Sequence, residues 1–142
     1  DGEEWKKLSE DYFFSEQRSI ENLDLYMDAR IIGAMVFTKA RNMNPRMYSI
    51  EFIRFVDAVL KIATKIVAGY ALGFDKDLLG GNIVYNKKAL RWANYGLDLL
   101  HGMKKGGIYE KEDYFELHEA LFEVRNNLGI YVQDLRERFN NS

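Results

Sequence analysis

Few side chains in this sequence are suited to metal or acid–base chemistry, and their spacing assembles no familiar catalytic group. The chain has two histidines and no cysteine, which excludes disulfides, thiolate metal sites and a cysteine nucleophile. Asp98 and His101 stand three residues apart, a spacing that could chelate a metal on one helix face. A di-metal carboxylate bundle needs a second Glu-x-x-His motif, but Phe115 stands three residues before His118. We therefore expect no bound metal, no cofactor and no small-molecule substrate.

Two further patterns that could indicate an enzyme are incomplete. Nucleases built from helical bundles often use an Arg and a His four to six residues apart on the final helix. Here no His follows Arg125, and His118 precedes it. The glycine pairs at 80–81 and 106–107 follow no expected strand and lack the phosphate-loop spacing, so they are better explained as turns. The sequence predicts a protein that is not an enzyme.

The charge distribution is more informative than the net charge of −2. Residues 30–105 carry +8, whereas residues 1–29 carry −6 and residues 106–142 carry −4. If the helices of the middle region share a surface, that surface is basic, and a phosphate backbone is its natural ligand. Alternatively, the same bases pair with the acidic helices inside the bundle or between subunits. The candidate nucleic-acid-binding residues are Arg41, Arg46, Arg54, Lys61, Lys65, Lys87, Lys88 and Arg91.

Aromatic residues lie among and beyond these bases. Trp92, Tyr95 and Tyr85 could stack on nucleobases, although aromatics at helical spacing are more often core or interface residues. Nearer the C-terminus, further aromatics widen the apolar face of the last expected helix beyond what the core of a bundle requires. This width indicates self-association through that helix. The candidate interface residues are Phe115, Phe122 and Tyr131.

The elements that must position these residues are helices. The chain contains one proline, and apolar residues recur at steps of three and four, which keeps them on one helix face. Ser49 is the expected N-cap of the second helix and Gly73 its C′ residue, while Pro45 ends the first helix. A loop is expected over residues 73–85. The expected helices span about 19–42, 50–72, 86–103 and 112–139.

Together these segments predict an all-α fold, an antiparallel up-down four-helix bundle over residues 19–142 with an N-terminal extension over residues 1–18. No apolar run is long enough to span a membrane, and no secretory leader is recognisable. We therefore expect a soluble, cytoplasmic protein that does not associate with membranes.

The order of these parts resembles a known group of small four-helix-bundle proteins over roughly residues 20–139. The group includes the 23S rRNA intervening-sequence proteins and the accessory variability determinant proteins of diversity-generating retroelements. The resemblance rests on Glu51-Phe52-Ile53-Arg54-Phe55, on the leucines at 97, 99 and 100, and on a last helix with Glu123-Val124-Arg125 followed by Leu128-Gly129.

The resemblance implies a ring-like pentamer that binds a reverse transcriptase and nucleic acid through basic surfaces. Residue by residue, it extends this role to Arg54 and to the basic positions of the middle helices.

Two functions follow as hypotheses. The first is a non-enzymatic, homo-oligomeric accessory protein that binds nucleic acid, or a nucleic-acid-processing enzyme, through a basic face of the middle helices. The alternative is a protein–protein adaptor or structural assembly subunit, such as a viral, plasmid or secretion component. Its broad apolar helix faces would bind a partner helix, and it would have no nucleic-acid role.

Overall fold

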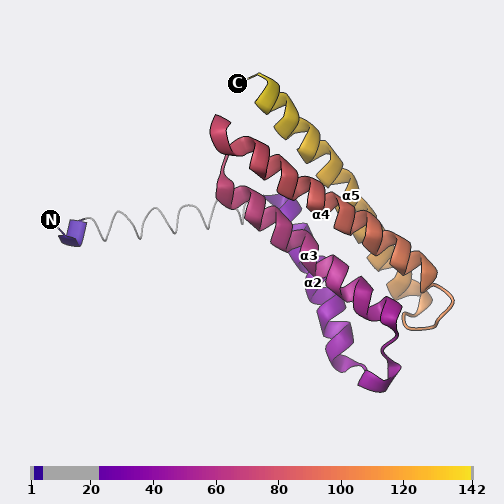
Figure 1. The fold of residues 1–142 in the computed structure, drawn as a ribbon. Coiled ribbons are helices and arrows are strands. Elements are labelled where there is room, and N and C mark those ends of the chain that lie inside the picture. Colours follow the sequence, from indigo (N-terminus) through magenta and orange to yellow (C-terminus); the bar gives the residue numbers. More distant parts are fainter. Residues whose placement is uncertain (1, 5–22, 142) are drawn as a thin grey trace.

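A computed structural model describes residues 2–4 and 23–141 of the chain. Four long helices pack against one another, and the described residues contain no strand (Figure 1). This confirms the predicted all-α class. Residues 19–22 of the first expected helix, and residue 1 and residues 5–18 of the expected N-terminal extension, lie outside the described residues. The elements are α2 (Asp24–Asn42), the 3₁₀ turn η1 (Pro45–Met47), α3 (Ile50–Leu72), α4 (Lys76–Gly102) and α5 (Lys111–Asn140).

Local sequence signals set the ends of α2 and α3. The Ser49 side chain accepts a hydrogen bond from the backbone N–H of Phe52 at 3.1 Å, so the predicted N-cap is confirmed. Gly73 ends α3 with a φ of +86°, a conformation that glycine adopts without strain. Helix α2 ends at Asn42, shortly before Pro45, as predicted. The hydroxyl of Tyr48 donates to the carbonyl of Ala40 and so ties the segment after η1 to the end of α2.

The loop predicted over residues 73–85 is wrong, because α4 begins at Lys76 and not near Asn86. The glycines that suggested a loop lie inside the helix, in its second turn. A Cβ at Gly81 would stand 2.7 Å from Cδ1 of Leu72, and one at Gly80 would stand 3.9 Å from the ring of Phe139. Gly81 therefore lets the Leu72 side chain approach the α4 backbone closely, whereas the contact at Gly80 is an ordinary van der Waals distance. Tertiary packing outweighs the low helix propensity of glycine here.

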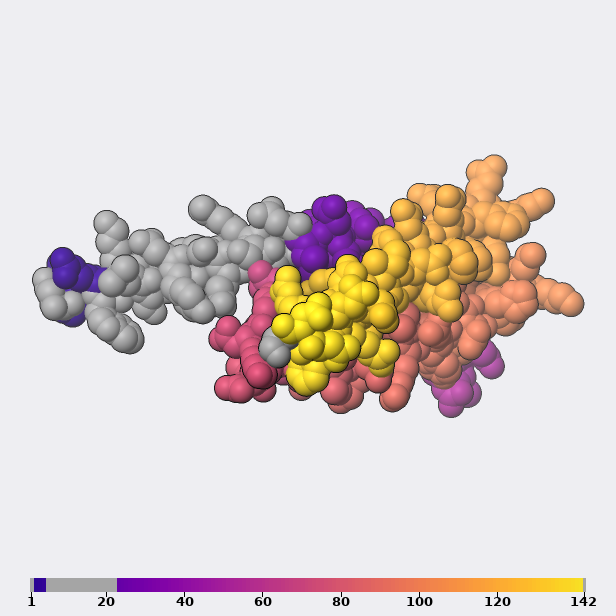
Figure 2. Space-filling model, turned by 90° about the horizontal axis from the view of Figure 1, so that it is seen from above, coloured from indigo at the N-terminus to yellow at the C-terminus, as the bar shows by residue number. Residues whose placement is uncertain are grey.

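Helix α3 lies between α2 and α4, and α5 packs against α4 and α2. Phe52, Phe55, Val59, Ile62 and Ile66 of α3 are almost fully buried and contribute to the main core. The space-filling view shows the C-terminal part of α5 at the surface, with α2 on one side of it and α4 on the other (Figure 2). This arrangement leaves a groove between α3 and α4 and another between α2 and α5 open to solvent.

Helices α3 and α4 have the most extensive contact, which includes a buried polar pair. Asn82 and Asn86 are fully buried. The side-chain amide of Asn86 donates to Oδ1 of Asn82 at 2.7 Å, and that of Asn82 donates to the carbonyl of Gly73 at 3.0 Å. Gly69 of α3 faces this pair, and any Cβ there would lie 2.6 Å from Oδ1 of Asn82. The pair therefore fixes how α3 and α4 pack at this end of the molecule.

Candidate nucleic-acid interface

Four predicted basic residues meet at a groove between α3 and α4. Lys61 and Lys65 lie one turn apart on α3, and Lys88 and Arg91 lie one turn apart on α4. These spacings place each pair on one helix face. The groove has a volume of about 430 Å³ and is open to solvent. It is lined by Lys61, Lys65, Lys88, Arg91, Trp92 and Tyr95.

The two aromatic side chains of the groove make close contacts with each other and with a lysine. The ammonium of Lys61 lies 4.4 Å from the centroid of the Trp92 ring, a cation–π distance. The Trp92 and Tyr95 rings meet edge to face, with their centroids 6.0 Å apart. The ammonium of Lys88 lies 5.3 Å from the centroid of the Tyr85 ring. The groove therefore combines cations with aromatic rings, the two features that bind a phosphate backbone and its bases.

Most of the positive charge of this groove is not neutralised. Lys61 Nζ pairs with Oδ2 of Asp57 at 2.8 Å, one turn away on the same exposed helix face. Exposed pairs of this kind contribute less than about 1 kcal/mol, so the ammonium can exchange this partner for another anion. Within residues 2–4 and 23–141, Lys65, Lys88 and Arg91 make no ion pair. Within the bundle, the described residues therefore do not pair these three bases with the acidic helices.

The other predicted basic residues do not line the groove. Arg54 is exposed on α3, two turns before Lys61 and on the same face. Lys87 is half-buried beside Lys88. Arg41, in the last turn of α2, and Arg46, in η1, are exposed on elements that take no part in the α3–α4 groove. The structure therefore brings together four of the eight predicted positions.

The predicted interface residues of α5 occupy two different environments. Phe115 and Phe122 are 49% and 47% exposed. His118 lies between them, and its ring stacks on Phe122 with a centroid distance of 6.1 Å and an interplanar angle of 11°. Tyr131 is half-buried and packs against a second small core cluster. Burial raises the pKa of Tyr131, while the nearby positive charge of Arg138 opposes the shift.

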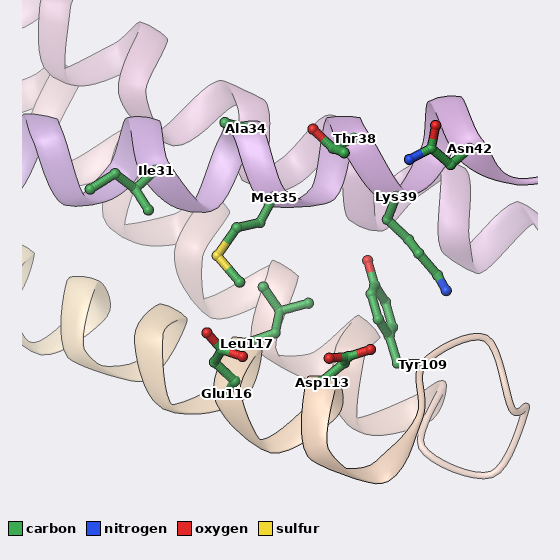
Figure 3. Close-up of a pocket in the computed structure, with 10 residues that line it drawn as sticks. All are labelled: Ile31, Ala34, Met35, Thr38, Lys39, Asn42, Tyr109, Asp113, Glu116 and Leu117. Carbon is green, nitrogen blue, oxygen red and sulfur yellow. The ribbon is translucent and has the colours of Figure 1, made fainter.

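A larger groove, of about 700 Å³, separates part of α2 from the start of α5 (Figure 3). The sequence did not predict this opening, which is lined on the α2 side by Ile31, Met35 and Thr38, among others. The helical spacing of these residues shows that they share a face. It does not show that the neighbouring helix leaves part of that face uncovered.

Neither groove presents a set of metal ligands. Asp98 and His101 are both exposed, and the described part of the chain contains no group of three or more side chains placed to hold a metal ion. Likewise, none of the described helices combines the length and apolar character that a membrane span requires.

Comparison of the chain with models of protein families, with curated proteins and with solved structures finds no match. The functional inference therefore rests on the side chains of the α3–α4 groove.

Proposed function

We propose that this protein is a non-enzymatic accessory protein that binds nucleic acid, or a nucleic-acid enzyme together with its nucleic acid, through the α3–α4 groove. The single observation that carries the proposal is the meeting of four cationic side chains and two aromatic rings at one groove. In this proposal the fold is an antiparallel up-down four-helix bundle, the location is cytoplasmic, and the protein self-associates through Phe115 and Phe122. The resemblance to the intervening-sequence and accessory-determinant proteins belongs to the same proposal.

The aromatic rings favour a single-stranded ligand. Base stacking on an aromatic side chain contributes about 1–3 kcal/mol per base and requires a base that is free of its duplex stack. Trp92 and Tyr95 line the same groove as the basic residues of α3 and α4, so a strand held by these cations lies within reach of both rings. We expect the groove to prefer single strands over duplexes and to show little sequence preference.

Salt-dependent binding tests this function. We expect a fluorescein-labelled single-stranded oligonucleotide to bind at low salt, with an affinity that falls as the salt concentration rises. Lys88→Glu and Arg91→Glu should each weaken binding and lower the slope of log K against log salt, by about 0.7 for each phosphate that the variant no longer neutralises. Fluorescence anisotropy at several salt concentrations measures both quantities.

Arg46→Glu is the matched control, because it makes the same change of charge at an exposed position outside the groove. We expect its salt slope to equal that of the wild type. If the wild type fails to bind at low salt, or if Arg46→Glu weakens binding as much as the groove variants do, the proposal is wrong.

A further inference from the structure

The groove between α2 and α5 has the form of a site for a helix. On α2, Ile31, Met35, Thr38 and Asn42 recur at steps of three and four and form one strip. The strip runs from residue 31 to residue 42, which is about 16 Å along the helix axis. Figure 3 shows the opposite wall, where Leu117 and the acidic side chains of α5 point toward α2. A seam of this length between two helices matches three turns of a third helix.

The floor of this groove is apolar and partly open to solvent. Ile31 is 56% exposed, although its neighbours Ile32 and Val36 are buried in the core. Met35 is half-buried and Leu117 is almost fully buried, so Ile31 and Met35 supply most of the accessible apolar lining. Such a surface binds the apolar face of an amphipathic helix, whose side chains at positions i, i+3, i+4 and i+7 enter the groove.

The charges of the two walls differ. The α5 wall carries the exposed carboxylates of Asp113 and Glu116. On the α2 wall, the ammonium of Lys39 lies 5.5 Å from the centroid of the Tyr109 ring. An incoming helix therefore meets negative charge along the side that faces α5, and basic residues on that flank complement it.

We propose that the α2–α5 groove binds an amphipathic helix of a partner protein, with its apolar face on Ile31 and Met35. Lys or Arg residues on the flank of this helix lie beside Asp113 and Glu116. The N-terminal residues of the chain itself are a poor match in charge, because residues 1–22 contain seven acids and three bases. The site is independent of the α3–α4 groove, since the two are formed by different pairs of helices.

A pair of synthetic peptides tests this proposal on the full chain. The first peptide has leucines at helical spacing on one face and lysines on both flanks, and the second carries glutamates in place of the lysines. We expect fluorescence anisotropy to show binding of the lysine peptide and at least tenfold weaker binding of the glutamate peptide. Glu116→Lys should reduce this preference.

Ile31→Asp separates apolar docking from simple charge attraction. The substitution adds a negative charge, so a purely ionic interaction with the lysine peptide would strengthen. Docking of leucines against Ile31 should instead weaken about tenfold. Phe37→Asp is the matched control, because Phe37 is 53% exposed on α2, outside the groove, and gains the same charge. We expect this variant to bind the lysine peptide at least as well as the wild type.

Three results would overturn the proposal: no binding of the lysine peptide, equal binding of the two peptides, or equal weakening by Ile31→Asp and Phe37→Asp. Light scattering gives a fourth such result. If the wild type is an oligomer and Ile31→Asp dissociates it, the groove is occupied by a second copy of the chain. Oligonucleotide binding by the Ile31→Asp variant, measured in parallel, reports separately on the α3–α4 groove.

Discussion

Tyr109 is a partly buried side chain whose hydroxyl group lacks a hydrogen-bond partner in the described part of the chain. Its ring lies 6.3 Å from both Phe52 and Phe55, measured between centroids, in the core beneath the loop before α5. Its hydroxyl oxygen is buried and has no hydrogen-bond partner in the described part of the chain. Burial, and to a smaller extent the negative charge of Asp113, raises the pKa of Tyr109 to about 12. The phenol therefore contributes apolar area but incurs a desolvation cost.

Tyr109→Phe should stabilise the protein at neutral pH. The substitution keeps the ring and removes a buried hydroxyl that lacks a partner, so we expect the free energy of unfolding to rise by about 1 kcal/mol. Urea denaturation of the two proteins measures the difference. A loss of stability in the variant would mean that the hydroxyl forms a hydrogen bond in solution.

The raised pKa of Tyr109 also predicts how this difference changes with pH. The folded state holds the proton up to about pH 12, whereas the unfolded chain releases it near pH 10. The unfolded state therefore binds fewer protons than the folded state above about pH 10, and wild-type stability falls as the pH rises. Because the variant lacks this group, its advantage should grow above about pH 10. An advantage that stays constant through this range would contradict the assignment.

At the scale of the helices, the contact between α3 and α4 depends on a residue without a side chain. A Cβ at Gly69 would lie 2.6 Å from Oδ1 of Asn82 and 3.0 Å from its backbone oxygen. The backbone atom cannot rotate away, and the asparagine side chain is fully buried. The two helices must therefore move apart to accept even a methyl group.

Gly69→Ala should destabilise the protein by about 2 kcal/mol, within the range for an overpacked core. Gly129→Ala is the control, since the Cβ of this α5 residue would meet nothing within 4 Å. Alanine there should increase stability by about 0.5–1 kcal/mol, because it favours the helix. Thermal or urea unfolding measures both effects. If the two variants change stability by the same amount, the close approach of α3 to α4 is not as described.

Helical periodicity predicted most of this architecture. The bounds of α3 are those expected, and α5 begins and ends within a residue or so of its prediction. The start of α4 could not be predicted, because Gly80 and Gly81 resemble a turn unless the close packing of Leu72 against Gly81 is known. Sequence signals report the local preference of the backbone, whereas here a tertiary contact determines where the helix begins.

The candidate site was predictable only in part. Helical spacing placed Lys61 and Lys65 on one face of α3, and Lys88 and Arg91 on one face of α4. How those two faces meet depends on the register between α3 and α4. This register could not be predicted while the start of α4 was misplaced. The α2–α5 groove was hidden for a similar reason, since only the pairing of helices shows which part of an apolar face is left uncovered.

At the scale of the whole molecule, the aromatic surface of α5 predicts self-association. Phe115 and Phe122 are exposed, and the ammonium of Lys104 lies 5.7 Å from the centroid of the Phe115 ring. We expect Phe122→Asp to reduce the molecular mass in solution to that of the monomer, because a carboxylate there would be buried in the interface. Phe37→Asp, on α2, should leave the mass unchanged. Analytical ultracentrifugation distinguishes these outcomes, and a wild-type monomer would contradict self-association.

The proposed nucleic-acid groove is tested most directly by the fluorescence of Trp92. The chain contains two tryptophans, Trp5 and Trp92, so in a Trp5→Phe variant all tryptophan emission comes from the groove. Stacking of a base on Trp92 should quench this emission, and the quenching should follow the same titration curve as the anisotropy of the labelled oligonucleotide. Binding of the oligonucleotide with no change in Trp92 emission would place the ligand elsewhere and contradict the proposed function.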